Sequence, residues 1–177
     1  VPLIAQFMKS VSWIPNPEIF LFDGDVVEEK NLTRQLFVST DVGKNKAKVL
    51  AERYSRAFNI PIYAVPMFIS PSNDDMLKAS GGETSLFNTD RATYEALLSI
   101  SSVDSPHSII HIMCVDTVQA RKSILNFSTS NFSSSPQNSS IYIDSGNGAD
   151  FGQILLFSPH AGVLNKEGAL ALSELES

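Results

Sequence analysis

Cysteine is almost absent from the sequence, which has Cys114 alone among 177 residues. A single cysteine excludes an internal disulfide and a four-cysteine zinc site. We expect Cys114 to behave as a small apolar residue inside a buried strand and not as a nucleophile, because a reactive thiolate needs an accessible, electropositive surrounding. Histidine is also scarce, and His107, His111 and His160 lack the spacing of metal ligands; we expect His111 to be a core or edge histidine.

Basic residues are few as well: 13 lysines and arginines stand against 19 acidic residues, for a net charge of −6. General nucleic-acid binding needs a basic patch, so we expect no nucleic-acid partner. The sequence has no apolar run long enough to span a membrane, and residues 1–10 lack the basic leader and cleavage pattern of a signal peptide. Together with the absence of disulfides, this predicts a cytoplasmic protein with no membrane partner.

Short apolar runs alternate with amphipathic segments along the chain. Its 43% of hydrophobic residues suffice for one substantial core, and alternating strands and helices favour a parallel sheet with right-handed crossovers. We therefore predict an α/β fold: a single Rossmann-like, three-layer domain over residues 1–177, with a mostly parallel sheet and a C-terminal antiparallel hairpin. The expected helices are residues 2–11, 44–58, 92–100 and 118–127, and the expected strands are residues 19–22, 61–69, 108–115, 141–144 and 153–157.

A dense set of polar residues follows the apolar run at residues 19–22. We expect that run to be a central parallel strand buried on both faces, which places Asp23 at its carboxyl end, where open α/β sheets bind ligands. Carboxylates can bind ribose hydroxyls, and arginine and lysine can neutralise phosphates. An isolated Asp-Gly-Asp is more typical of a turn that caps backbone N–H groups, but the Asn-Leu-Thr-Arg-Gln that follows favours a nucleotide site. The residues in question are Asp23, Asp25, Asn31, Arg34, Gln35, Lys44 and Lys46.

Three blocks of the chain resemble the ATP-binding core of the ThiF/MoeB/ubiquitin-activating-enzyme superfamily, and most closely the ThiF-like proteins of bacterial mobile elements. Residues 23–35 follow the pattern D-x-D-x-V-x-x-x-N-L-x-R-Q, and residues 41–47 contain a G-x-x-K-like segment. Residues 114–121 are similar to the family's C-x-D-N-x-x-A-R, with Thr117 in place of the usual Asn. In the family, a first strand and a G-x-G-G-x-G loop precede the helix expected at residues 2–11; this sequence begins after them, so we expect the chain alone to have little or no activity.

The resemblance implies ATP and Mg²⁺ as cofactors and no zinc site in this chain. It implies that Asp23 accepts hydrogen bonds from the ribose hydroxyls, and that Arg34 and Lys46 bind phosphates. Asp25, Asn31 and Gln35 complete the implied ATP-binding set. For Asp25 a bracing role in the turn remains open, and for Asn31 and Gln35 an orienting or capping role.

Asp116 resembles the family's Mg²⁺-binding aspartate. It follows the strand expected at residues 108–115, and the prediction is that it meets Asp23 at one edge of the sheet. A helix cap for residues 118–127 is the alternative role for Asp116. We expect Arg121, further along that helix, to serve structure and not chemistry.

The function implied is ATP-dependent adenylation of the C-terminal glycine carboxylate of a ubiquitin-like or sulfur-carrier protein ending in Gly-Gly, by a homodimer. Arg34, Lys46 and Asp116 would be the catalytic residues, because Mg²⁺ and the two cations stabilise charge that develops on the phosphoryl oxygens. Two alternatives stay open: a catalytically silent ThiF-like nucleotide-binding or assembly module, and an NAD-dependent Rossmann enzyme.

Overall fold

The computed structural model describes eight segments of the chain, which form two compact units. The first unit contains the described residues up to Phe68, and the second contains the described residues that follow α4 (Arg91–Ser101). The boundary between the two units falls within α4. Each unit has its own hydrogen-bonded sheet. The described segments are residues 1–11, 15–69, 90–101, 108–115, 117–131, 139–147, 152–158 and 162–163.

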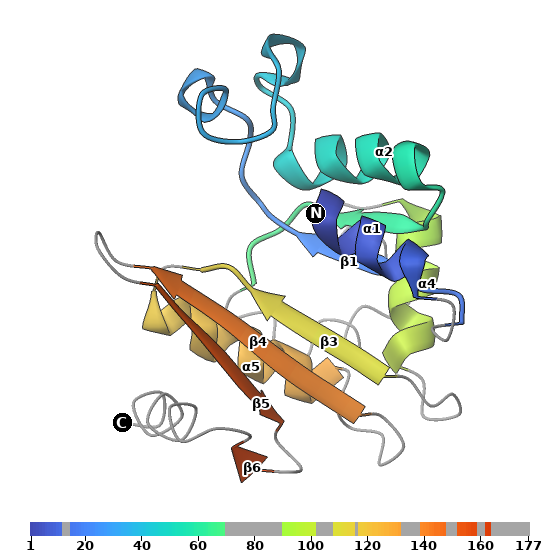
Figure 1. Cartoon of the computed structure of the whole chain (residues 1–177), viewed down its shortest axis with the longest axis vertical. Helices are drawn as coiled ribbons and strands as arrows, with labels where there is room; N and C mark the ends of the chain where they lie inside the picture. The colour runs from blue at the N-terminus through green and yellow to red at the C-terminus, as the bar shows by residue number, and fades with distance from the viewer. Residues whose placement is uncertain are drawn as a thin grey trace. The chain divides into compact units, whose positions relative to one another are not determined.

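The first unit is built on two parallel strands, β1 (Ile19–Phe22) and β2 (Ile62–Val65), in register from the Ile19–Ile62 pair to the Phe22–Val65 pair. Parallel strands need a crossover connection, and α2 (Lys46–Phe58) supplies it. Together with α1 (Pro2–Ser10), α2 packs on one face of this sheet (Figure 1). Their shared core contains Ala5, Ala51 and Ile62, with Ile19, Leu21, Tyr54, Phe58 and Ala64 packed against it.

β1 lies where the sequence predicts it, but its four residues are half-buried, not fully buried on both faces. On the face away from the Ala5–Ala51–Ile62 core, Phe20 stacks on Tyr63 with ring centroids 4.9 Å apart. One face of β1 therefore packs on the α1–α2 core, while on the other face Phe20 contacts its neighbour on β2 and stays half-buried.

α2 begins two residues later than its apolar spacing predicts, because Asn45 caps it. The Asn45 side chain accepts a hydrogen bond from the Lys48 N–H, and the helix ends at Asn59 in the left-handed conformation, with a φ of 52°. Asp41, which the sequence places near the helix start, lies instead in a short 3₁₀ turn (Ser39–Asp41).

The second unit contains the predicted C-terminal hairpin. β3 (Ser108–Met113) runs parallel to β4 (Ser139–Asn147), β4 is antiparallel to β5 (Gly152–Ser158), and the short β6 (Gly162–Val163), which the sequence did not predict, extends the sheet. α5 (Val118–Asn131) lies along this sheet (Figure 1), where its Ile124 and Leu125 pack against Met113 and Tyr142. The predicted α/β, Rossmann-like class is confirmed.

One prediction about this unit is wrong: Cys114 is exposed and follows the end of β3, instead of being buried inside it. The apolar pattern runs on through Val115, but the pairing of β3 with β4 stops at Met113. At the start of α4, Asp90 Oδ1 accepts the Thr93 N–H at 2.8 Å and so caps the helix. Across the segments that are described, no helix combines the length and apolarity that a membrane crossing requires.

Candidate functional site

The Asp-Gly-Asp turn continues directly from β1. The Asp23 N–H donates to the Val65 carbonyl at 3.2 Å, which extends the strand pairing by one residue. Asp23 Oδ1 then accepts the Asp25 N–H at 2.8 Å and closes the turn. A Cβ at Gly24 would lie 2.5 Å from Cδ2 of the Phe68 ring, so a larger residue here would force the exposed Phe68 side chain to move. Asp23 thus has the capping role of a turn aspartate through Oδ1, whereas its Oδ2 accepts no hydrogen bond within the described residues.

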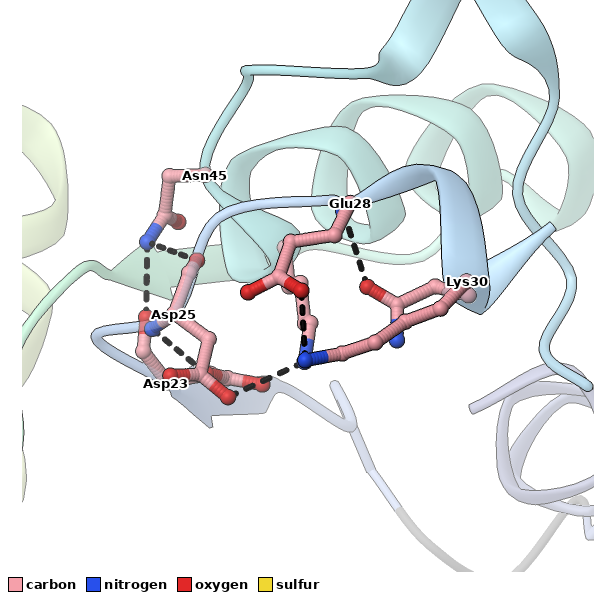
Figure 2. A network of polar contacts seen from close by, with 7 residues as sticks. Asp23, Asp25, Glu28, Lys30 and Asn45 are labelled. Atoms are coloured by element: carbon pink, nitrogen blue, oxygen red, sulfur yellow. Dashed lines mark hydrogen bonds and ion pairs between the residues drawn. The ribbon is translucent and has the colours of Figure 1, made fainter.

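Asn45 attaches this turn to the start of α2. Its Nδ2 donates to the Asp23 carbonyl at 2.8 Å and to the Asp25 carbonyl at 3.0 Å, while its Oδ1 caps the helix (Figure 2). The Lys46 N–H adds a hydrogen bond to the Asp25 carbonyl at 2.9 Å. The sequence reasoning missed Asn45, although an asparagine directly before an amphipathic run is a typical N-cap signal.

Lys46 points its ammonium group back to the same turn. Lys46 Nζ lies 3.0 Å from Asp25 Oδ2, and the Lys46 side chain is 14% exposed against 54% for Asp25. The lysine that the sequence assigns to phosphate binding is therefore largely withdrawn from water and already paired with a carboxylate.

A pocket of about 290 Å³ opens beside this turn, near the lower end of the size range of small-molecule sites. Three predicted ATP-binding residues line it: Asp23, Gln35 and Lys46. The structure thus brings these three together within the first unit. The rest of the wall is mostly apolar and consists of Val1, Pro2, Leu36, Phe37, Leu50 and Tyr54.

The electrostatics of the pocket centre on Asp23. Its burial raises the pKa of the Asp23 carboxyl above the ordinary value. The hydrogen bond from the Asp25 N–H lowers that pKa, the negative charge of Asp25 raises it, and the positive charge of Lys46 lowers it. Asp25 therefore acts on Asp23 in two opposite ways, through its backbone and through its charge.

Asn31 and Arg34 do not line the pocket. Asn31 is buried, and its Oδ1 accepts the Glu28 N–H at 2.9 Å while its carbonyl accepts the N–H groups of Arg34 and Gln35. Asn31 thus holds the turn that carries the other two, which is the orienting role left open by the sequence. The Arg34 side chain is exposed, and within the described residues its guanidinium has neither a hydrogen bond nor an ion pair.

The segment that supplies Leu36 and Phe37 to the pocket is fixed by a buried carboxylate. Asp41 Oδ2 accepts the Val38 N–H at 2.9 Å and pairs with Arg53 of α2, which also donates to the Leu36 carbonyl. The hydrogen bond from Val38, followed by the contact with Arg53, holds the pKa of Asp41 below its ordinary value. The fold therefore stabilises Asp41 as an ionised group that anchors one wall of the pocket.

In the second unit, Asp116 lies outside the described residues, so its magnesium role stays a prediction. The cap of α5 comes from its neighbour, because Thr117 Oγ1 accepts the Ala120 N–H at 3.2 Å. Arg121 is structural, as expected: its Nε lies 2.6 Å from Asp144 Oδ2 and its Nη2 donates to the Val115 carbonyl at 2.7 Å. Both side chains are largely buried, and among the described residues Asp144 Oδ1 has no hydrogen-bond partner.

His111 lies half-buried on β3, the strand at one edge of the four-stranded sheet in the described part of the chain, which fits the predicted core or edge histidine. Its ring stacks on Tyr142 with centroids 4.4 Å apart, and Ser128 Oγ lies 3.0 Å from its Nε2. Burial lowers the pKa of His111 to about 4. His107 and His160 lie outside the described residues. Within the part of the chain that is described, no three His, Cys, Asp or Glu side chains are grouped so that they could hold a metal ion.

Comparison with known proteins agrees with the motif pattern. No curated protein matches the chain. Residues 17–163 match the family model described as the ThiF family, and this range includes the Asp-Gly-Asp turn, α2 and both described sheets. The chain therefore belongs to the ThiF family.

Proposed function

We propose that this protein uses ATP to adenylate the C-terminal glycine carboxylate of a ubiquitin-like or sulfur-carrier protein. ThiF-family proteins are typically adenylyltransferases of this kind. The observation that carries the proposal is the pocket that Asp23, Gln35 and Lys46 line together. A carboxylate, an amide and an ammonium group beside apolar walls suit a ligand with a sugar, phosphates and an aromatic base.

Residues in the pocket and beside it can each be assigned to a part of ATP. Asp23 Oδ2, which accepts no hydrogen bond within the described residues, would accept the ribose hydroxyls. Lys46 would contact a phosphate as a point charge, and Arg34, whose guanidinium has no described partner, would engage phosphate oxygens through its planar fork. Gln35 would contact the nucleotide at the pocket wall, and Asn31 would hold the turn that presents Arg34 and Gln35.

The proposed reaction needs charge stabilisation more than proton transfer. A carboxylate oxygen of the carrier protein forms a bond to the α-phosphorus of ATP, the bond to the bridging oxygen breaks, and pyrophosphate leaves. The attacking carboxylate is already ionised, so no general base is required. Arg34 and Lys46 would stabilise the negative charge that develops on the phosphoryl oxygens. Mg²⁺, when bound, neutralises phosphate charge, and Asp116 is its proposed protein ligand.

The remaining features of the proposal follow from family membership. The carrier protein would present a flexible Gly-Gly tail, the enzyme would act as a homodimer in the cytoplasm, and the chain would form a single ThiF-like domain.

The test is ATP–pyrophosphate exchange by the full-length protein, with and without a Gly-Gly-ended carrier protein. We expect exchange only with the carrier, and we expect Asp23→Asn to weaken ATP binding measured by calorimetry by about 1.5–3 kcal/mol, the contribution of a charged-group hydrogen bond. ATP binding without exchange would instead indicate a silent nucleotide-binding module, and preferential binding of NAD would indicate a dinucleotide enzyme. Unchanged ATP affinity in Asp23→Asn would remove the proposed ribose contact.

A further inference from the structure

Asp25 divides its contacts between backbone and side chain in an informative way. Its N–H closes the turn on Asp23, and its carbonyl accepts hydrogen bonds from Asn45 Nδ2 and the Lys46 N–H. Within the described residues, its carboxylate has one partner, the Lys46 ammonium at 3.0 Å. The backbone therefore braces the turn whatever the side chain is, and the carboxylate acts on Lys46 alone.

This pairing has a consequence for any phosphate that enters the pocket. The Lys46 side chain is only 14% exposed, so its ammonium group contacts little water, and its partner is the Asp25 carboxylate. Asp25 occupies one of the three N–H donors of the Lys46 ammonium, so a phosphate oxygen that approaches Lys46 competes with the Asp25 carboxylate for the same positive charge. Asp23 and Asp25 together also outweigh the single charge of Lys46, so an incoming polyanion meets a local excess of negative charge.

We propose that the Asp25 carboxylate is the resident counter-ion of Lys46 and that it opposes nucleotide binding instead of contributing to it. The Asp25 carboxylate holds Lys46 at the pocket while no phosphate is bound. It also lowers the affinity of the pocket for each anionic ligand that competes with Asp25 for Lys46. This inference rests on the proposed function of the same pocket. It separates two neighbouring aspartates of one motif: Asp23 favours the nucleotide, and Asp25 competes with its phosphates.

The test compares Asp25→Asn with wild type in calorimetric titrations of the full-length protein with ATP, AMP and adenosine. Asparagine keeps the backbone contacts and the size of the side chain but removes the charge. Exposed ion pairs contribute up to about 1 kcal/mol, so we expect ATP to bind about two- to five-fold more tightly, AMP to gain less, and adenosine to gain nothing. A residue that only stabilises the fold would weaken all three ligands.

Two controls isolate the contact with Lys46. Glu28→Gln removes a carboxylate from the following turn, where Glu28 pairs with Lys30 (Figure 2), and should leave ATP affinity nearly unchanged. In a Lys46→Ala background, Asp25→Asn should no longer strengthen ATP binding, because the ion pair that it breaks is already absent. Asp25→Ser provides a second uncharged variant should Asp25→Asn fold poorly.

The proposal is overturned if Asp25→Asn weakens ATP binding, if adenosine gains as much as ATP, or if the gain persists without Lys46. Asp23→Asn distinguishes this failure from failure of the proposed function. A loss of ATP and adenosine affinity in Asp23→Asn supports the nucleotide site even when Asp25→Asn disproves the counter-ion role. Unchanged affinity for both ligands in Asp23→Asn contradicts the nucleotide site, and the counter-ion proposal fails with it.

Discussion

Replacing Asn45 by alanine should damage both the stability of the first unit and its pocket. The change removes the cap on the Lys48 N–H, typically worth about 1 kcal/mol. It also removes two hydrogen bonds from Nδ2 to the carbonyls of Asp23 and Asp25, at about 0.5–1.5 kcal/mol each. We expect the free energy of unfolding, measured in urea, to fall by about 2–4 kcal/mol. ATP affinity should fall as well, because Asn45 fixes the turn of Asp23 relative to Lys46.

Two variants separate these contributions. Asn45→Ser keeps a helix cap but has no amide to reach the two carbonyls, so it should lose ATP affinity with a smaller loss of stability. Asn59→Ala strains the left-handed residue at the other end of α2 and should cost about 1–2 kcal/mol of stability without changing ATP affinity. An Asn45→Ser protein that matches wild type in both stability and ATP affinity would show that the two carbonyl contacts contribute nothing.

Four further perturbations probe the candidate site and the second unit. The proposed contact with two ribose hydroxyls uses the ionised Asp23 carboxylate, and burial raises the pKa of this group. ATP affinity should therefore be full above the raised pKa and fall as the pH drops through it. Calorimetry at a series of pH values that finds no loss of ATP affinity at acidic pH would contradict the contact between Asp23 and the ribose. Arg34→Ala should slow ATP–pyrophosphate exchange roughly 10²–10³-fold and leave the unfolding curve unchanged. Cys114→Ser should leave exchange intact, since adenylation uses no thiol. Loss of exchange in a well-folded Cys114→Ser protein would indicate different chemistry. Arg121→Met leaves the buried Asp144 carboxylate without its Arg121 partner and should cost about 3–5 kcal/mol in urea unfolding, and most of this loss should be recovered when Asp144→Leu is added. A double variant whose loss equals the sum of the two single losses would mean that the two residues act independently.

The sequence predicted the parts of the fold that are encoded locally. The run at residues 19–22 is a strand, and the apolar spacing after Lys44 is a helix, because each pattern is set by neighbours along the chain. Asp23 and Lys46 were predicted to share a ligand, and both line one pocket, whereas the shared ligand itself stays a prediction. The pairing of these two residues was expected from motif spacing that the resemblance supplied.

The parts that were missed depend on which distant residues meet. Asn45 bonds to a carbonyl 22 residues earlier in the chain, and Arg121 pairs with Asp144 23 residues later. No periodicity identifies such partners, since tertiary packing selects them. Cys114 was placed in a buried strand because the apolar run continues past Met113, yet β3 ends where its pairing with β4 ends, and hydropathy does not report that boundary.

The first turn of α2 belongs at once to a helix end and to the wall of the pocket. Helix ends open more readily than helix centres, so this turn samples frayed states while the rest of the helix stays intact. Each frayed state moves Lys46 away from Asp23 and disrupts the pocket wall, so we expect it to bind nucleotide poorly. The apparent affinity for nucleotide is the intrinsic affinity multiplied by the closed fraction. Asn45 raises the closed fraction through its three hydrogen bonds. A change that makes the first turn of α2 open more often should therefore lower the apparent nucleotide affinity, even when no residue that contacts the nucleotide is altered.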